Sequence, residues 1–240
     1  MTVLPYKEKS TGKKAQVAEM FDNISPKYDL LNRVLSAGID IQWRKKAIRL
    51  LKPSNPKLIL DIATGTADLA IEALSLQPDK IIGVDISAGM LEVGRQKLAK
   101  MGLTDRIELQ LGDSERLTFA DNTFDAVMVS FGVRNFEDLE NGLRDMYRVL
   151  KPGGTVVILE FSQPTLFPFK QLYGFYSRQV LPRVGKLVSH DPAAYTYLPE
   201  SVKQFPYGAD FQQIMEKVGF EHTTCRSLTF GISSIYMGKK

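Results

Sequence analysis

Small and acidic residues stand at four places in the sequence where a short apolar run ends. A carboxylate at such a position accepts hydrogen bonds from both hydroxyls of a ribose, and glycine lets the backbone turn tightly and approach a ligand. If the four runs are neighbouring strands of one parallel sheet, their ends face a single crevice, which is where such sheets bind ligands. The pattern predicts a nucleoside-binding site made of Gly65, Thr66, Asp85, Asp113, Ser114 and Ser130.

The acidic residues have the clearest expected parts in binding. Asp85 stands twenty residues after Gly65, the spacing at which a carboxylate meets a ribose, with a solvated or capping aspartate as the structural alternative. Asp113 is placed to hold an adenine amino group, and the Ser114 backbone to meet the ring edge. Ser130 is expected to line the methionine end of the same ligand, if that ligand is S-adenosylmethionine.

The turn that contains Gly65 separates two kinds of cofactor. Dinucleotide-binding proteins carry the pattern G-x-G-x-x-G there, but Ala63 stands where the first glycine would be and the spacing differs. Thr66 is instead placed to cap the following helix, whose free N–H groups would face the crevice. The missing diphosphate loop favours S-adenosylmethionine over NAD, and a plain strand-to-helix turn is the structural alternative.

The elements that must position these residues alternate regularly. Apolar runs typical of buried parallel strands are separated by segments with helical periodicity. This alternation predicts an α/β fold with a doubly wound, Rossmann-like sheet of seven mostly parallel strands. We expect strands at 57–62, 80–85, 106–111, 124–130, 154–160, 220–227 and 231–238, and helices near 66–76, 87–101, 137–151 and 208–218.

Length and composition exclude several classes of protein. The 240 residues are 44% hydrophobic and 24% charged, which is the balance of a globular protein and not of a disordered or fibrous one. A single cysteine, Cys225, excludes an internal disulfide and a cysteine-based zinc cluster, and we expect no metal site. Residues 1–53 are expected to form a helical extension with a frayed start (1–14), packed on a core domain (54–240) with an insertion at about 162–205.

Four strings of the sequence resemble the menaquinone/ubiquinone biosynthesis C-methyltransferases. They are Tyr28-Asp29-x-x-Asn32-x-x-x-Ser36-x-x-x-x-x-x-Trp43, Ser130-Phe-Gly-Val-Arg-Asn135, Arg148-Val-Leu-Lys-Pro-Gly-Gly-Thr-Val-Val-Ile-Leu-Glu160-Phe-Ser162 and Tyr195-x-Tyr197-Leu-x-Glu200-Ser201-Val-x-x-Phe-Pro206. The resemblance covers nearly the whole chain and implies the fold of a class I S-adenosylmethionine-dependent methyltransferase. It implies that the methyl donor contacts Thr66, Asp85, Asp113, Ser114 and Ser130.

The resemblance also implies the substrate, a polyprenylated hydroquinone that is methylated on a ring carbon. A short N-terminus without a presequence is most similar to the bacterial members that convert demethylmenaquinol to menaquinol. Some relatives methylate the methoxy-benzoquinol precursor of ubiquinone, and the sequence leaves that activity open. The alternatives from other classes are a noncatalytic nucleotide-binding module and a nucleic-acid methyltransferase, although no Asn-Pro-Pro-Tyr or Asp-Pro-Pro-Tyr string for a flipped base is present.

Methylation of the ring requires help with the neighbouring hydroxyl, because a phenol has a pKa of about 10 and its phenolate makes the ring carbon nucleophilic. Arg134 cannot act as a base at neutral pH, but its guanidinium can stabilise the developing oxyanion. A surface arginine paired with Glu137 or Asp138 is the alternative. Asn135 is expected to orient the ring oxygen, or else to cap the next helix.

The general base and the walls of the substrate pocket are further expectations. His190, beside Asp191, is the candidate base, and a solvated loop histidine is the alternative. Tyr28 and Asn32 are expected to bind the quinol from the N-terminal helices. Trp43 is expected either to join them or to pack those helices on the sheet.

The insertion at 162–205 is dense in aromatic residues, among them Tyr195 and Tyr197, which we expect to bind the substrate. Such density is typical of a lid that shields an apolar substrate and excludes water from the reaction. A structural cap or a homodimer interface would use the same residues, so both readings stay open.

Positive charge is concentrated in the N-terminal extension. Residues 1–53 hold eleven Lys and Arg against five Asp and Glu. With a lipid substrate, this charge favours transient contact with an anionic membrane surface over binding to nucleic acid. We expect a cytoplasmic protein that is peripheral at the inner face of the cell membrane, with the contact made by Arg33, Arg44, Lys45, Lys46 and Arg49.

Overall fold

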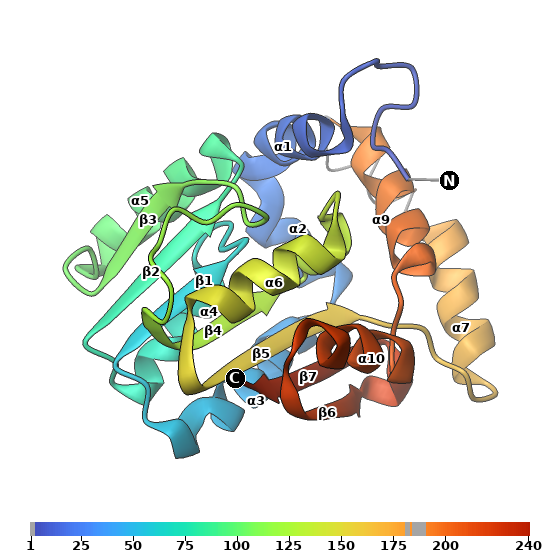
Figure 1. The fold of residues 1–240 in the computed structure, drawn as a ribbon. Helices are drawn as coiled ribbons and strands as arrows, with labels where there is room; N and C mark the ends of the chain where they lie inside the picture. Colours follow the sequence, from blue (N-terminus) through green and yellow to red (C-terminus); the bar gives the residue numbers. More distant parts are fainter. Residues whose placement is uncertain (1–2, 181–182, 184–190) are drawn as a thin grey trace.

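A seven-stranded sheet forms the centre of the computed structural model, which describes residues 3–180, 183 and 191–240 (Figure 1). The strands are β1 (Leu58–Ile62), β2 (Lys80–Asp85), β3 (Ile107–Leu111), β4 (Phe124–Ser130), β5 (Leu150–Phe161), β6 (Glu221–Leu228) and β7 (Ser233–Lys239). They run in the order β3-β2-β1-β4-β5-β7-β6. The first five pair in parallel, whereas β7 is antiparallel to β5 and β6. The predicted doubly wound, mostly parallel sheet is confirmed.

Helices cover both faces of this sheet, because successive residues of a strand point to opposite sides. The helices are α3 (Ile39–Leu51), α4 (Asp68–Ala73) with the 3-10 turn η3 (Leu74–Leu76), α5 (Ala88–Met101), α6 (Leu139–Val149) and α10 (Ala209–Val218). On one face, Ile59 of β1 belongs to an apolar cluster with residues of α3, α4 and α5. On the other face, Leu60 belongs to a cluster with residues of α6 and α10. A short 3-10 turn, η2 (Lys52–Ser54), follows α3 and leads to β1.

One strand begins earlier than the sequence predicts. β5 starts at Leu150, whereas the expected start was residue 154. Its register against β4 shifts between Phe124 and Ala126, so the Lys151-Pro-Gly-Gly154 segment bulges within the strand and does not precede it. As a consequence, α6 ends at Val149, before the predicted 151.

The N-terminal extension consists of α1 (Lys13–Ile24), the 3-10 turn η1 (Ser25–Lys27), α2 (Tyr28–Leu35) and α3. The first two helices pack against α9 (Pro192–Gln204), and the three share a third apolar cluster. Tyr6 belongs to this cluster, and its backbone N–H donates to Gln16 Oε1 at 2.9 Å. The expected fraying of residues 1–14 is therefore wrong for the part that the structure describes, because burial of Tyr6 anchors it.

The insertion is mostly helical and contributes α7 (Phe169–Phe175), the π-helical turn η5 (Tyr176–Val180) and α9. In Figure 1 these elements lie on the opposite side of the molecule from α5 and β3. A last turn, η6 (Thr229–Gly231), joins β6 to β7. Across the described ranges, no helix combines the length and the apolar character needed to cross a membrane.

Candidate active site

The carboxyl ends of four neighbouring strands meet at one crevice, which we call the strand-end crevice. Five of the six residues predicted to bind a nucleoside line it: Gly65 after β1, Asp85 at the end of β2, Asp113 and Ser114 after β3, and Ser130 at the end of β4. The strand order β3-β2-β1-β4 brings these ends together, as the parallel sheet requires. Thr66 is the one predicted residue that does not line the crevice.

Thr66 has a different role from the one the sequence suggests. The residue at the N-cap of α4 is Ala67, in the left-handed conformation with a φ of 68°, and no side chain caps this helix. The Thr66 hydroxyl instead donates to Asp29 Oδ1 of α2 at 2.6 Å. The expected cap is wrong, because the hydroxyl is engaged by a side chain that only the folded N-terminal extension supplies.

Asp85 is held by the backbone on both of its oxygens. Oδ2 accepts a hydrogen bond from the Gly65 N–H and Oδ1 from the Ser87 N–H, both at 2.8 Å. Burial raises the pKa of Asp85 to about 6, although these N–H groups lower it. At neutral pH the group is thus a fixed carboxylate, and its remaining lone pairs are free to accept hydrogen bonds from ribose hydroxyls.

The crevice also shows the close backbone approach that a nucleoside site needs. Gly65 has a φ of +56°, and a Cβ atom at this position would lie 3.0 Å from Met90 Cε. A Cβ atom at Gly132 would lie only 2.6 Å from the Cβ of Ala63. The residues present therefore fit a nucleoside-containing methyl donor.

The N-terminal extension covers the strand-end crevice. Lys14, Val17 and Phe21 of α1, together with Tyr28 of α2, line it opposite the strand ends. The sequence predicts a helical extension over residues 1–53 but gives no reason to place its first helix here. Val17 and Phe21 carry the apolar periodicity of this helix, which was the signal that it packs on something.

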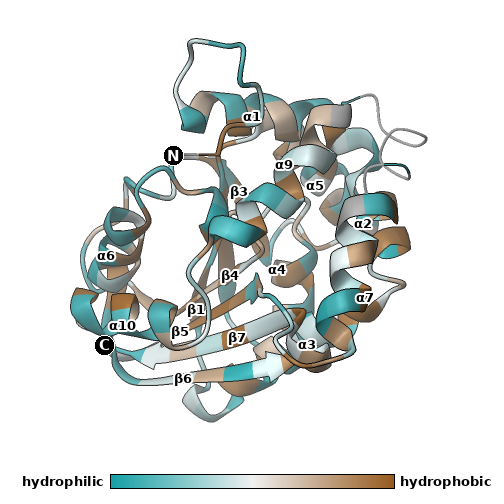
Figure 2. Ribbon diagram, turned by 90° about the vertical axis from the view of Figure 1, so that its right-hand side faces the viewer, coloured by the Kyte–Doolittle hydropathy of each residue, from teal (hydrophilic) through white to brown (hydrophobic). Residues whose placement is uncertain are grey.

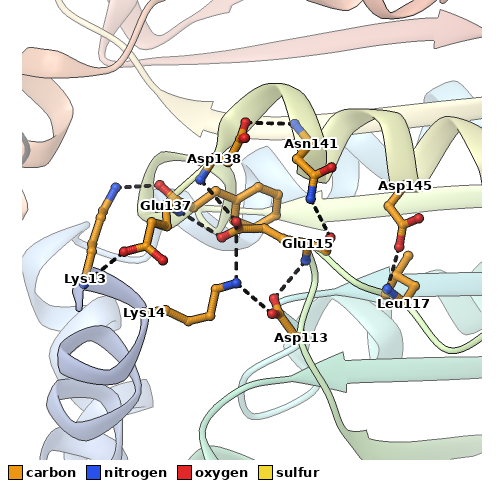
Figure 3. A network of polar contacts seen from close by, with 10 residues as sticks. Lys13, Lys14, Asp113, Glu115, Leu117, Glu137, Asp138, Asn141 and Asp145 are labelled. Atoms are coloured by element: carbon orange, nitrogen blue, oxygen red, sulfur yellow. Dashed lines mark hydrogen bonds and ion pairs between the residues drawn. The ribbon is translucent and has the colours of Figure 1, made fainter. Parts of the chain in front are cut away.

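Polar contacts fasten this cover at two points. Lys14 Nζ lies 2.6 Å from Asp113 Oδ2 (Figure 3). Asp22 Oδ1 accepts from the Ser87 hydroxyl at 2.6 Å and from the Gly89 N–H at 2.8 Å. An adenine amino group would therefore share the Asp113 carboxylate with Lys14, whereas Asp85 makes no such contact with a side chain of opposite charge.

A second cavity, of about 450 Å³, adjoins the crevice, and we call it the apolar cavity. Its walls come from α1, α2, α3, α7, α9 and η6, so it combines the N-terminal extension with the insertion. Phe21, Tyr28 and Phe131 line both spaces, which shows where they meet. All the residues that sequence analysis assigned to the quinol pocket line this cavity: Tyr28, Asn32, Trp43, Tyr195 and Tyr197.

Aromatic rings form the wall of the cavity next to the sheet. Phe131 and Phe161 stack with centroids 4.4 Å apart, and Trp43 packs near both, at 6.1 and 6.3 Å. The Trp43 indole N–H donates to the Thr229 hydroxyl at 2.8 Å. Trp43 therefore lines the cavity and also packs α3 on the sheet, so both of its expected roles are present.

Arg134 is the charged group of the cavity nearest this wall. It lies on the 3-10 turn η4 (Val133–Asn135), and its side chain is 7% exposed. Nη1 lies 2.9 Å from Glu160 Oε1 at the end of β5 and also contacts the Phe131 carbonyl, while Nε has no hydrogen-bond partner among the residues that the structure describes. The alternative of a surface arginine paired with Glu137 or Asp138 is wrong, because those side chains are turned toward α1 and α6.

Glu160 is the residue of this site that sequence analysis missed. Its carboxylate is fully buried and accepts from the backbone N–H groups of Arg134, at 3.2 Å, and Phe161, at 2.8 Å. The residue lies in one of the strings that carry the family resemblance, so the signal was present. Its partner was not visible, because 26 residues separate it from Arg134.

Three tyrosines in the cavity respond to the charge of Arg134. Burial raises the pKa of Tyr28, and it raises the pKa of Tyr173 and of Tyr197 to about 12. In each case the nearby Arg134 acts in the opposite direction and lowers the pKa. These phenols therefore stay protonated donors at neutral pH, while Arg134 favours the charged form of each and Glu160 opposes it at Tyr197.

Asn135 links the turn η4 to the insertion. Its Oδ1 accepts a hydrogen bond from the Tyr197 hydroxyl of α9 at 3.1 Å. The alternative role as a helix cap is wrong, because Asp138 caps α6 through the Asn141 N–H. Asn135 lines the strand-end crevice while Tyr197 lines the apolar cavity, so this pair spans the junction of the two.

The candidate base His190 lies outside the described residues. Its neighbour Asp191 is described, and it caps α9 by accepting from the Ala193 N–H at 3.0 Å. Asp191 also contacts the Tyr6 hydroxyl and the Asn23 amide.

Asp40, which lines the apolar cavity, is paired with Arg44 at 2.8 Å. Among the residues that the structure describes, no cluster of side chains suits a metal ion.

Two named proteins match this chain over nearly its whole length. A protein of Bacteroides fragilis named demethylmenaquinone methyltransferase is 52% identical over 99% of this chain and 97% of its own length. A protein of Geotalea daltonii named ubiquinone/menaquinone biosynthesis C-methyltransferase UbiE is 48% identical over 97% of this chain and 99% of its own.

The solved structures confirm the predicted methyltransferase fold. A SAM-dependent methyltransferase of Thermotoga maritima, described as a possible histamine N-methyltransferase, matches with a TM-score of 0.63 at 19% identity. The match covers 93% of this chain and 99% of that one, and it bears on the fold alone. These methyltransferases support S-adenosylmethionine as the methyl donor, which is the donor expected from the strand ends. The profile of the ubiE/COQ5 methyltransferase family matches residues 9–240, and the chain therefore belongs to that family.

Proposed function

We propose that this enzyme transfers a methyl group from S-adenosylmethionine to a ring carbon of demethylmenaquinol and so produces menaquinol. The observation that carries the proposal is the junction at Phe131, where a crevice suited to a nucleoside opens into an aromatic-walled cavity of about 450 Å³. A bicyclic quinol ring with an apolar tail matches that lining. The Bacteroides fragilis relative carries the corresponding name.

The residues of the cavity supply what ring methylation demands. The sulfonium of S-adenosylmethionine provides an electrophilic methyl group, whose bond to sulfur breaks as the bond to the ring carbon forms. Arg134 stabilises the negative charge on the adjacent ring oxygen, which makes that carbon nucleophilic. Glu160 holds Arg134 in place at 2.9 Å, and Asn135 with Tyr197 orients the ring oxygen. The aromatic walls exclude water, and S-adenosylhomocysteine is the leaving group. The methylated ring carbon then loses its proton to a base, for which His190 is the candidate, and the ring becomes aromatic again.

The binding sites within this scheme follow the two spaces. In our proposal Gly65, Asp85, Asp113, Ser114 and Ser130 bind the methyl donor, and Thr66 supports their loop from behind through Asp29. The quinol binds between Tyr28 and Asn32 on one side and Tyr195 and Tyr197 on the other. His190 remains a proposal as the group that receives a proton.

We further propose that the enzyme works at the cytoplasmic face of a membrane, where its lipid substrate resides. Arg33, Lys45, Lys46 and Arg49 are exposed on α2 and α3 and can meet anionic headgroups. Arg44 is withdrawn from the set that the sequence suggested. It is buried and forms ion pairs with Asp40 and Asp68 at 2.8 and 3.1 Å, so its charge is not available to a membrane.

The direct test is methyl transfer from labelled S-adenosylmethionine to three acceptors. These are reduced demethylmenaquinone, the methoxy-benzoquinol precursor of ubiquinone, and total RNA. We expect label on a ring carbon of the naphthoquinol, identified by mass spectrometry and by a carbon-bound methyl resonance. Label on the benzoquinol in addition would define a dual enzyme. Label on oxygen or RNA alone, or none from protein that binds S-adenosylhomocysteine normally, would exclude the proposal.

A further inference from the structure

Exposed apolar side chains are concentrated on one side of the described chain. Nine large apolar side chains are more than half exposed, and two of them, Met101 and Leu111, belong to α5 and β3. The other seven lie on α2, on η6 and on the segment that leads into and through α7. We call them the apolar rim: Leu30, Val34, Leu166, Phe167, Leu172, Phe175 and Phe230.

The apolar rim surrounds an opening of the apolar cavity. Leu172 is 61% exposed and yet lines the cavity, so the cavity reaches the surface beside α7. Ala37, in the turn after α2, is also exposed and also lines it. Figure 2 shows α2 and α7 next to each other on one side of the molecule. The opening therefore lies between these two helices.

Contacts fix both ends of this opening. The Tyr176 hydroxyl donates to the Leu35 carbonyl at 2.7 Å, which ties η5 to the end of α2. At the other end of α7, the rings of Phe169 and Phe230 stack with centroids 3.8 Å apart. These contacts hold α7 and η5 against α2 and η6. The helices therefore present apolar side chains both to the cavity and to the outside.

The charge around the rim identifies what covers it. Lys170 and Arg183 are exposed in the described part of the insertion, and residues 162–180 contain no acidic side chain. Arg33, next to Val34 on α2, is exposed as well. A second copy of this surface would bring like charges together, whereas an anionic lipid bilayer complements both the charge and the exposed apolar side chains.

We propose that the apolar rim inserts into an anionic bilayer, and that the prenyl tail passes from the lipid directly between α2 and α7 into the apolar cavity. The second part rests on the proposed function, and the first part does not. The basic residues of α2 and α3 would then steer the enzyme to the membrane, while the rim sets its depth and orientation. The substrate tail never crosses water on this route.

The first test measures binding to vesicles of phosphatidylglycerol and phosphatidylcholine by flotation. The triple variant Val34→Ser/Phe167→Ser/Phe175→Ser removes rim residues that do not line the cavity. We expect it to lose at least about tenfold in vesicle affinity, since each exposed apolar side chain adds to partitioning. The matched control Met101→Ser/Leu111→Ser, on α5 and β3, keeps wild-type affinity. Equal binding of the two variants overturns the proposal.

A second measurement reports insertion itself. Phe175→Trp places an indole on the rim, and lipids brominated in their acyl chains should quench its fluorescence, whereas Leu111→Trp stays unquenched. Binding without quenching of Phe175→Trp means contact through charge alone and overturns insertion. If the rim variant changes oligomeric state in size-exclusion chromatography and not vesicle affinity, the rim is an interface between copies and the proposal is wrong.

Activity on two substrates separates the route from the proposed function. The triple variant should methylate a short-tailed, water-soluble quinol at the wild-type rate and lose turnover on a long-tailed quinol embedded in vesicles. If the variant keeps the wild-type turnover on both substrates, the lateral route is wrong. Wild-type protein that methylates neither quinol contradicts the proposed function, while flotation and quenching still decide whether the rim inserts.

Discussion

The strand-end crevice and the apolar cavity meet at three aromatic residues, yet they are built in different ways. The crevice mixes polar and apolar lining residues, and backbone N–H groups hold its key carboxylate, Asp85, at 2.8 Å on each oxygen. The cavity is mostly apolar, and its buried ion pair next to the sheet, Arg134 with Glu160 at 2.9 Å, joins two side chains that backbone groups also contact. The carboxylate of the crevice is therefore positioned by backbone N–H groups, whereas the cation of the cavity depends on an acidic side chain as well.

This difference assigns separate tasks to the two spaces. Substitutions in the crevice should change donor affinity and leave the chemical step alone. Substitutions in the cavity should change the chemical step or quinol affinity and leave the donor alone. Each prediction below can break that division, and we order them by the size of the expected effect.

Replacing Arg134 with alanine should have the largest effect. We expect kcat to fall about 100- to 1,000-fold, the usual result of removing one preorganised group that stabilises an oxyanion. Affinity for S-adenosylhomocysteine, measured by calorimetry, should be unchanged, because Arg134 lines the cavity and not the crevice. A large loss of donor affinity would show that the two spaces are not independent.

The control for this variant must deal with Glu160. Arg134→Ala leaves a fully buried carboxylate without its ion-pair partner, and breaking such a pair costs about 3–5 kcal/mol of folding free energy. The double variant Arg134→Ala/Glu160→Gln removes the unpaired charge and should regain thermal stability. If kcat returns together with Tm, the arginine acts only on the fold; if kcat stays low, it acts on the reaction.

The same division explains how much the sequence predicted. Five of the six residues predicted to bind the nucleoside do line the crevice. Their positions at strand ends were enough to predict this, because the order of parallel strands brings those ends together wherever the helices lie. The prediction that Thr66 caps a helix is wrong, because its hydroxyl donates to Asp29, 37 residues earlier in the chain. The predicted start of β5 is wrong because a bulge in its register against β4 lengthens the strand.

The cavity was predictable in its residue types but not in its pairings. Aromatic residues of the extension and the insertion indicated an apolar pocket, and the chemistry of ring methylation singled out Arg134. The structural alternative paired this arginine with Glu137 or Asp138, the nearest acids in sequence. Tertiary packing overrides that proximity, because Asp138 caps α6 and Glu137 accepts from the Lys13 N–H, which leaves Glu160 across the sheet edge.

Replacing Asp85 with asparagine should weaken donor binding and spare the chemical step. Hydrogen bonds to a charged group contribute about 1.5–3 kcal/mol, so we expect the Kd for S-adenosylhomocysteine to rise about 10- to 100-fold. At saturating donor, kcat should stay near the wild-type value. Asp113→Asn is the matched control and should lose less, because Lys14 already engages that carboxylate at 2.6 Å. A lower kcat at saturation would contradict the assignment of Asp85.

Acidification should weaken donor binding through the same residue. The pKa of Asp85 is raised by burial to about 6, so the group is ionised at pH 7 and becomes protonated as the pH falls through 6. A protonated carboxyl accepts ribose hydrogen bonds poorly, and one linked proton predicts about a tenfold loss of affinity between pH 7 and pH 5. Calorimetry with S-adenosylhomocysteine across this range measures it.

One neighbouring carboxylate could imitate this pH dependence. Burial raises the pKa of Asp61 on β1 to about 7, and Asp61 interacts electrostatically with Asp85. Asp85→Asn separates the cases, because the pH dependence between 7 and 5 should disappear with it. Persistence of the slope in Asp85→Asn would assign the proton to Asp61.

Replacing Tyr197 with phenylalanine should have the smallest effect and test the junction itself. The variant loses one hydrogen bond, from the hydroxyl to Asn135 Oδ1 at 3.1 Å, and such a bond contributes about 0.5–1.5 kcal/mol net. We expect kcat/KM for the quinol to fall about two- to tenfold, because Asn135 is no longer held toward the ring oxygen. Tyr176→Phe, which removes a hydroxyl bound to the Leu35 carbonyl, is the control and should leave turnover of a soluble quinol unchanged. If Tyr197→Phe weakens donor binding as strongly as quinol turnover, then Asn135 serves both spaces, and the division between the crevice and the cavity ends at this residue.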